Sequence, residues 1–269
     1  TTVADFEVGA GDTVPFVLTY GPSHLPVPKA IDPSYALKDT EAFWKEWCSR
    51  CTYQGEYRDL VLRSLITLKA QTYAPTGGIV AAPTTSLPEK LGGTRNWDYR
   101  FCWLRDATFT LLALMNSGYT EEASAWHQWL LRAAAGSPAN MQIMYGIMGQ
   151  RRLLEWEATW LPGYEGAKPV RVGNAAHAQL QLDVYGGILS AAFDYVESGE
   201  TLQADEGRLL AGFGKVAARQ WREPDNGLWE IRGERRHYTV SKVLCWAALD
   251  RLARLAERGL VRIDVGRVR

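Results

Sequence analysis

A carboxylate beside a large aromatic residue is the feature of this sequence best suited to chemistry. Glu230 directly follows Trp229, just after a Pro-Asp-Asn-Gly turn at 224–227. A carboxyl group held against an indole loses contact with water, which disfavours its ionised form and raises its pKa. Such a group can deliver a proton near neutral pH, so Glu230 is a candidate general acid. The alternative is an exposed loop glutamate that pairs with Arg232 or Arg235.

A second cluster of charged and aromatic residues precedes a predicted helix, in the segment "GGTRNWDYRFCWLRDATFT". Trp103, Arg105 and Asp106 lie near its end. Asp106 could simply cap the helix and pair with Arg105. The density of indoles favours another role, because aromatic faces flanked by planar hydrogen-bonding groups match the apolar face and hydroxyl rim of a sugar. We therefore predict a sugar pocket here.

A third cluster contains Gln181 and Asp183, at alternate positions in "RVGNAAHAQLQLDVYGG" near the start of a predicted helix. They either line the same site or form part of a solvated helix face, and the pattern leaves both interpretations open. His177 in the same segment is more typical of a structural histidine, so we assign it no role.

Composition limits the classes of partner. The chain has 269 residues and is 46% hydrophobic, which is sufficient for a substantial core. Thirty basic residues balance thirty acidic ones, so nothing indicates binding to nucleic acid or to an anionic membrane. No apolar run approaches the roughly 20 residues needed to span a bilayer, and no signal peptide is visible. We expect a globular protein with a neutral ligand.

The cysteines favour a reducing compartment. Cys48, Cys51, Cys102 and Cys245 are too sparse for a disulfide framework, so we expect a cytoplasmic protein. Cys48 and Cys51 form a C-x-x-C pair, but no second pair and no nearby pair of histidines completes a zinc site. We predict buried or half-buried thiols and neither a metal nor an organic cofactor.

Helices are expected to position the candidate residues. Apolar residues recur at helical spacing in six segments, and Gly136 follows the third as its stop signal. The segments are 56–73, 105–118, 120–135, 176–196, 202–221 and 239–259. Three long irregular stretches, 73–102, 137–174 and 221–237, separate some of these helices and carry the unusual residues.

The start of the chain follows a different pattern. Residues 1–24 alternate apolar and polar side chains, which predicts one or two strands. A proline-rich connector follows. It leads to a helix predicted at about 38–50, with Asp39 or Thr40 as its cap.

Long stretches of the chain resemble glycoside hydrolase family 15. They include "TLKAQTYAPTGGIVAAPTTSLPEKLGGTRNWDYRFCWLRDATFTLLAL", "QIMYGIMGQRRLLEWEATWLPGYEGAKPVRVGNAAHAQLQLDVYGG" and "DNGLWEIRGERRHYTVSKVLCWAALDR". The family contains glucoamylases, related exo-acting α-glucosidases and α,α-trehalases. The resemblance implies a mainly α fold, the (α/α)6 toroid of two concentric rings of six helices, which a β-sandwich domain precedes in prokaryotic members.

By this resemblance the chain corresponds to about half of a toroid. Residues 1–24 would be the terminal strands of a β-sandwich domain, 25–54 a linker with one helix, and 55–269 the first half of the catalytic domain. Half a toroid exposes apolar packing faces, which favours association. We expect two copies to pair, and the alternatives are that another polypeptide supplies the second half or that the natural protein is longer.

The resemblance also implies site roles. Glu230 in "GLWEIRG" matches the general acid of an inverting mechanism, in which a second carboxylate activates water. Four further positions match the terminal sugar subsite: Arg105 and Asp106 in "WLRDA" as ligands of the outer hydroxyls, and Trp103 and Trp229 as walls. Gln181 and Asp183 match a segment that lines this pocket. The motif of the catalytic base, a glutamate in a later loop, has no counterpart here.

The function implied is an inverting, exo-acting α-glucoside hydrolase of glucoamylase type, which releases glucose from non-reducing ends of α-glucans or oligosaccharides. One alternative is an α,α-trehalase of the same family. A second is a sugar-binding fragment without turnover, since inversion requires a base. Asp98 and Asp183 are carboxylates that could replace that base, and the sequence singles out neither.

Overall fold

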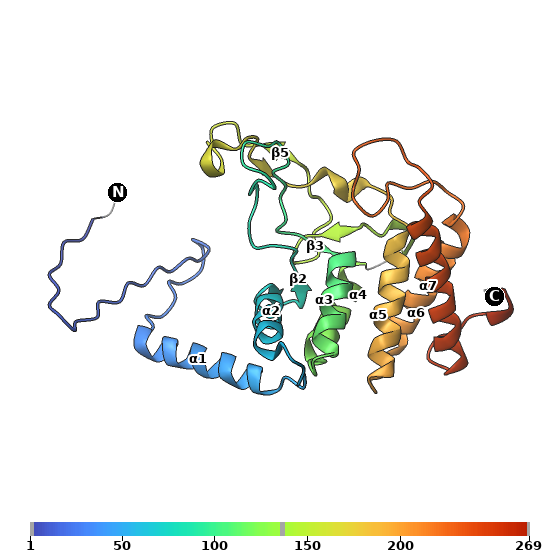
Figure 1. Cartoon of the computed structure of the whole chain (residues 1–269), viewed down its shortest axis with the longest axis horizontal. Coiled ribbons are helices and arrows are strands. Elements are labelled where there is room, and N and C mark those ends of the chain that lie inside the picture. The colour runs from blue at the N-terminus through green and yellow to red at the C-terminus, as the bar shows by residue number, and fades with distance from the viewer. Residues whose placement is uncertain (1–2, 135–137, 268–269) are drawn as a thin grey trace. The chain divides into compact units, whose positions relative to one another are not determined.

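The structure is a computed structural model that describes residues 3–134 and 138–267. The chain divides into two compact units, Thr1–Cys51 and Thr52–Arg269. Helices dominate the described residues (Figure 1), so the prediction of a mainly α protein is confirmed. None of the helices described is both long and apolar enough to cross a membrane.

The first unit contains helix α1 (Pro33–Ser49), which begins earlier than predicted. Asp32 provides the cap, because its side chain accepts hydrogen bonds from two backbone N–H groups of the first turn, at 2.9 and 3.1 Å. Proline suits the first helical position, where its missing N–H is not needed. Asp39 and Thr40 therefore lie inside the helix, and their prediction as caps is wrong.

Residues 3–24 form no β-strand, although their sequence alternates apolar and polar side chains. All of them are exposed, including Phe16 (72%), Leu18 (99%) and Tyr20 (94%). A β-strand is stabilised by hydrogen bonds to a neighbouring strand. Within the described chain, residues 3–24 pair with no such strand. The predicted strands are therefore not formed here, and the assignment of 1–24 to a β-sandwich domain stays a prediction.

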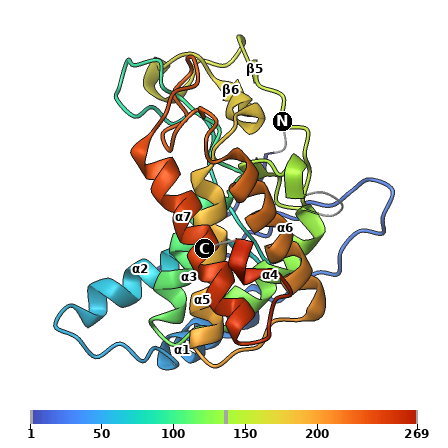
Figure 2. The same ribbon diagram turned by 90° about the vertical axis from the view of Figure 1, so that its right-hand side faces the viewer.

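The second unit contains six α-helices in its described part, the number predicted. They are α2 (Arg58–Ala70), α3 (Leu104–Met115), α4 (Glu121–Ala133), α5 (Asp183–Glu197), α6 (Ala204–Gln220) and α7 (Thr239–Glu257). The expected helix end at Gly136 lies outside the described residues. Helix α5 packs against both α3 and α7, and α6 packs against α7 (Figures 1 and 2).

Small residues allow the closest of these helix contacts. A Cβ atom on Gly186 of α5 would lie 2.4 Å from the carbonyl oxygen of Leu244 on α7. A Cβ atom on Gly214 of α6 would lie 2.2 Å from a methyl carbon of Leu252, also on α7. Glycine is therefore required at Gly186, where a backbone atom lies opposite, whereas at Gly214 the neighbour is the end of a flexible side chain. Large buried side chains fill the remaining core, among them Trp126, Trp129, Tyr145 and Phe213.

Most of the short strands and 3₁₀ turns lie in or at the edge of the stretches predicted to be irregular. The helix predicted at 176–196 begins only at Asp183, and a 3₁₀ turn occupies the start of that segment. The antiparallel pairs are β1 (Thr72–Tyr73) with β2 (Gly78–Ile79), β3 (Cys102–Trp103) with β4 (Met144–Tyr145), and β5 (Trp156–Glu157) with β6 (Arg171–Val172). The 3₁₀ turns are Pro138–Asn140, Tyr164–Gly166, Ala175–Ala178 and Val265–Arg267. Long loops and strands gather at one end of α3, α5 and α7 (Figures 1 and 2), so residues far apart in sequence meet there.

Candidate active site

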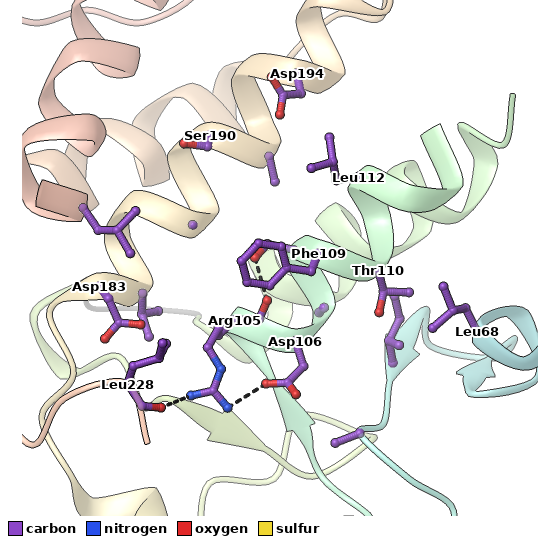
Figure 3. Close-up of a pocket in the computed structure, with 18 of the residues that line it drawn as sticks. Leu68, Arg105, Asp106, Phe109, Thr110, Leu112, Asp183, Ser190, Asp194 and Leu228 are labelled. Atoms are coloured by element: carbon purple, nitrogen blue, oxygen red, sulfur yellow. Dashed lines mark hydrogen bonds and ion pairs between the residues drawn. The ribbon is translucent and has the colours of Figure 1, made fainter. Parts of the chain in front are cut away.

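Arg105, in the first turn of α3, connects the residues of the candidate site. Its Nη1 donates to Glu230 Oε1 at 2.8 Å and to the carbonyl oxygen of Leu228. Its Nη2 lies 2.9 Å from Asp106 Oδ2, and Figure 3 shows the guanidinium between Leu228 and Asp106. Burial lowers the pKa of Arg105, but the charges of Asp106 and Glu230 raise it overall, so this side chain is a fixed cation.

Asp106 pairs with Arg105 as one interpretation of the sequence predicted, but it does not cap the helix. The N-cap of α3 is Trp103, and no side chain makes a capping hydrogen bond there. The Asp106 side chain is 42% exposed and lines both cavities described below. Asp106 is therefore free to bind a ligand through the part of its carboxylate that Arg105 does not occupy.

Glu230 has one anchored and one free carboxylate oxygen. Oε1 accepts hydrogen bonds from Arg105 at 2.8 Å and from Gln181 Nε2 at 2.9 Å. Oε2 accepts none from any residue that the structure describes. The backbone of Glu230 has a φ of +48°, a left-handed conformation that is uncommon for a residue other than glycine. The alternative in which Glu230 pairs with Arg232 or Arg235 is wrong.

Trp229 does not bury the carboxyl group of Glu230, contrary to our sequence-based reasoning. Its indole is 78% exposed. Polar contacts to Arg105 and Gln181 position the acid in place of the predicted apolar contact. Trp229 nevertheless lines both cavities, as a pocket wall would.

Two cavities meet at Arg105, Asp106 and Trp229. The first, the helix cavity, has a volume of about 610 Å³ and lies among residues of α2, α3, α5 and α7. The second, the acid cavity, has a volume of about 740 Å³ and lies among the long loops. Its further lining includes Trp97, Tyr99, Trp103, Asn174, Glu230 and Arg232. Aromatic rings beside charged groups in a space of this size suit a sugar of one or two rings.

Gln181 and Asp183 are buried, with exposed fractions of 3% and 2%, so the interpretation as a solvated helix face is wrong. Gln181 reaches the site through its hydrogen bond to Glu230, whereas Asp183 lines the helix cavity. Burial raises the pKa of Asp183 to about 6, and the nearby carboxylates of Asp225 and Glu230 add to this effect while Arg105 opposes it. Asp183 therefore changes charge close to neutral pH.

The turn before Glu230 positions the segment of Gln181, which the sequence did not predict. Asp225 Oδ2 accepts a hydrogen bond from the N–H of Leu182 at 2.9 Å. Asn226 exchanges two hydrogen bonds with the backbone of Leu180, at 2.9 and 3.1 Å. Aspartate and asparagine are common in turns for local reasons, so their types alone gave no signal of these contacts across the fold.

Asp98 has a structural role and does not serve as a catalytic base in this arrangement. It is fully buried, and both of its oxygens accept hydrogen bonds from the Arg100 side chain, at 2.9 and 2.8 Å. The N–H of Gly173 donates a further bond to Oδ2 at 2.9 Å. Asp98 therefore joins two loops behind the site.

Several buried polar atoms make no hydrogen bond among the described residues, and two of them belong to side chains of the candidate site. Trp103 Nε1 and Gln181 Oε1 are both shielded from solvent and make no hydrogen bond. Buried polar groups normally find a partner in protein, ordered water or ligand. Within the same ranges, no three His, Cys, Asp or Glu side chains lie together as a metal site requires, and the four cysteines are free thiols.

The family model described as "Glycosyl hydrolases family 15" matches residues 55–265. A trehalase of Mycobacterium tuberculosis is 40% identical over 252 residues, which cover 92% of this chain and 37% of the relative. A trehalase of Thermoplasma acidophilum is 37% identical over 234 residues, which cover 87% of this chain and 40% of the relative.

Trehalase 1 of Sulfolobus acidocaldarius is 40% identical over 187 residues, which cover 68% of this chain and 33% of the relative. The chain thus spans between 33% and 40% of the length of these three relatives. No solved structure matches the chain significantly.

Proposed function

Because the chain belongs to glycosyl hydrolase family 15, we propose that it contributes the general acid and the terminal-glucose pocket of an inverting α-glucoside hydrolase, with trehalose as the substrate. The two oxygens of Glu230 provide the main support. Two donors hold Oε1, while Oε2 is free of protein partners at the acid cavity. This leaves Oε2 to carry a proton toward a bound sugar.

The chemistry follows from that arrangement. Glu230 transfers a proton to the glycosidic oxygen as the bond between this oxygen and the anomeric carbon breaks. Water attacks the anomeric carbon from the opposite face and loses a proton to a base. Arg105 stabilises the carboxylate that remains on Glu230. We assign neither candidate carboxylate as the base, since Asp98 is committed to Arg100 and Gly173 and Asp183 lines the helix cavity and not the acid cavity.

The pocket residues suit a glucose ring. Trp103 and Trp229 offer aromatic surface, and Asp106 offers a carboxylate to hydroxyl groups. The unpartnered Trp103 Nε1 is a further donor for a sugar oxygen. The sequence favoured α-glucans over trehalose, whereas the similar proteins reported above are named trehalases, and we therefore place trehalose first.

Hydrolysis and binding test this proposal together. The 269-residue chain and its Glu230→Gln variant are assayed for glucose release from trehalose, maltotetraose and isomaltose, and for trehalose affinity by calorimetry. We expect the variant to lose hydrolysis of trehalose and to keep its affinity, because glutamine preserves the shape of the side chain but has no acidic proton. Preferred release from maltotetraose would favour the glucoamylase-type activity.

Each other outcome has a defined meaning. Equal loss of turnover and affinity in Glu230→Gln would contradict the role as acid. Trehalose binding without turnover in the unmodified chain would favour the sugar-binding alternative for these 269 residues. Absence of both would refute the proposal for this chain.

A further inference from the structure

Four side chains from three loops form a contact cluster beside Glu230, which we call the arginine latch: Trp97, Glu155, Arg171 and Arg232. Arg232 donates to both oxygens of Glu155, with its Nη1 at 2.9 Å from Oε1. Arg171 Nε lies 3.6 Å from the same Oε1. Glu155 therefore joins the loop of Glu230 to the strand pair β5 and β6.

The ring of Trp97 contacts the guanidinium groups of both arginines in the latch. Their central carbons lie over its ring, at 4.2 Å from the centroid for Arg232 and 4.6 Å for Arg171. Cation–π contact favours this arrangement, and planar guanidinium groups are better suited to it than ammonium groups. Arg171 is further fixed by a hydrogen bond from Nη1 to the carbonyl oxygen of Thr94 at 2.8 Å. The position of Arg232 is thus determined from two sides, by a carboxylate and by a ring.

Glu155 also extends the latch to the segment that leads to Gln181. Its Oε2 accepts a hydrogen bond from the N–H of Ala175 at 3.1 Å. Burial raises the pKa of Glu155, but hydrogen bonds from Arg232 and Ala175 and the charges of Arg232 and Arg171 lower it overall. One ionised carboxylate therefore aligns the loop of Glu230 with the segment that supplies its hydrogen-bond donor.

The loop of Glu230 needs such a tether. Trp229 and Ile231, on either side of the acid, are 78% and 53% exposed, so apolar burial does little to hold the loop. The left-handed backbone at Glu230 is unfavourable for glutamate and persists only where its surroundings impose it. Arg105 holds the carbonyl oxygen of Leu228 and, with Gln181, the carboxylate of Glu230. After the acid, the carbonyl oxygens of Glu230 and Ile231 receive only long contacts from Gln179 Nε2, at 3.3 and 3.4 Å. The ion pair of Arg232 with Glu155 is the next fixed point along the chain.

From these contacts we infer that Arg232, held by Glu155 and Trp97, is a positioning residue that fixes the loop of Glu230 and so directs its carboxyl group into the acid cavity. This role rests on the proposed function of Glu230 as the acid. Arg232 also lines the acid cavity, but its guanidinium group is committed to Glu155 and to the ring of Trp97, so we expect it to act on Glu230 through the backbone.

Hydrogen exchange of the 269-residue chain tests the tether without any ligand. The amides of Asp225, Gly233 and Arg236 make hydrogen bonds that close this loop, at 2.8 to 2.9 Å. In Arg232→Ala we expect them to exchange at least tenfold faster, because the ion pair and the ring contact are both lost. Arg232→Lys keeps the charge but loses the bidentate geometry. Its exchange rates should therefore lie between those of the unmodified chain and those of Arg232→Ala. Arg235→Ala is the matched control, an exposed arginine of the same loop, and should leave these rates unchanged.

Turnover and affinity separate positioning from substrate binding. In Arg232→Ala we expect kcat for trehalose to fall about tenfold to a hundredfold, as for a misplaced catalytic group, with trehalose affinity within twofold of the unmodified chain. Glu155→Gln should reproduce both effects. Unchanged exchange in Arg232→Ala, or equal acceleration in Arg235→Ala, would overturn the positioning role. Loss of affinity with unchanged exchange would also overturn it and make Arg232 a sugar ligand. Undiminished hydrolysis in Glu230→Gln would instead refute the proposed acid, whatever the exchange rates show.

Discussion

Arg105 determines the charge balance of the candidate site. Its single positive charge lies between the carboxylates of Asp106 and Glu230, and the electrostatic influence of Asp183 also reaches it. The group of four therefore carries more negative than positive charge when all are ionised. Such a site suits a neutral ligand rich in hydroxyl donors, because hydroxyl groups can hydrogen-bond to carboxylates without adding further negative charge.

Asp106 is expected to contribute to sugar affinity. Replacement by alanine removes a charged acceptor at the junction of the two cavities, and the loss of such a hydrogen bond corresponds to about 1.5 to 3 kcal/mol. We therefore predict weaker trehalose binding by that amount in Asp106→Ala, measured by calorimetry. Asp205→Ala, an exposed aspartate in the first turn of α6, is the control and should bind as the unmodified chain does. Unchanged affinity in Asp106→Ala would restrict Asp106 to its ion pair with Arg105.

Asp183 gives the stability of the fold a pH dependence. Its pKa is about 6 in the folded chain against an ordinary value of 3.8, so the folded state holds its proton more tightly than the unfolded state does. The free energy of unfolding should therefore decrease as pH rises from about 4 to about 6, by about 3 kcal/mol at most for this group.

The Asp183→Asn variant cannot ionise at this position and should lack that decrease. We predict that it is more stable than the unmodified chain at pH 7 and that the difference disappears toward pH 4, measured by urea unfolding at several pH values. Asp205→Asn is the exposed control. Parallel stability curves for Asp183→Asn and the unmodified chain would show that Asp183 is ionised without cost in the fold.

The candidate residues could be predicted from the sequence, but the contacts that position them could not. Arg105, Glu230 and Gln181 were identified from residue types and resemblance, and the structure brings all three within hydrogen-bond distance. The indole contact expected at Glu230 was wrong because adjacent residues in a turn can point apart. Asp225 and Glu155 lack any local signal, since their partners lie on distant segments of the chain.

At the scale of elements, the contact of α5 with α7 depends on Gly186. An added methyl group there would lie 2.4 Å from the carbonyl oxygen of Leu244, a backbone atom that can move only with its helix. We predict that Gly186→Ala destabilises the fold by about 1 to 3 kcal/mol, the usual cost of overpacking, measured by urea unfolding.

Gly187→Ala is the matched control on the same helix. Its added methyl group would lie 3.2 Å from the side-chain oxygen of Thr108, a milder overlap than the one at Gly186. Alanine is also the better helix former by up to about 1 kcal/mol. This variant should be neutral or stabilised. Equal destabilisation of the two variants would show that the close contact of Gly186 with α7 is not the cause of the loss of stability.

Helical periodicity predicted the elements of the second unit well because each of its helices has an apolar face that the core covers. Helix α1 differs, since its start is set by Asp32 and Pro33 and not by a change in periodicity. The strands predicted in 1–24 had the right alternation but no neighbouring strand in the described residues. Local pattern thus predicts which conformation a segment favours, and long-range pairing decides whether a strand forms.

At the scale of the whole molecule, α7 presents apolar side chains to solvent. Val240, Val243 and Trp246 are 39%, 53% and 65% exposed and recur every three residues along this helix. Exposed apolar surface of this kind favours association. We predict concentration-dependent self-association of the 269-residue chain by analytical ultracentrifugation and its reduction in Trp246→Glu.

Trp160→Glu is the control for this prediction, because Trp160 is 71% exposed and lies outside α7. It should leave association unchanged. A monomer at all concentrations would contradict the prediction, and equal effects of the two substitutions would show that association does not depend on α7.

The wall shared by the two cavities offers a route by which such a protein could change its substrate selectivity. Arg105, Asp106 and Trp229 border both the acid cavity, where we propose that the sugar binds, and the helix cavity. Substitutions at apolar positions on the hidden side, such as Val184 or Leu244, would shift that wall without touching a ligand. Selectivity among related sugars could therefore drift through changes in the interior, while every residue that contacts the substrate stays the same.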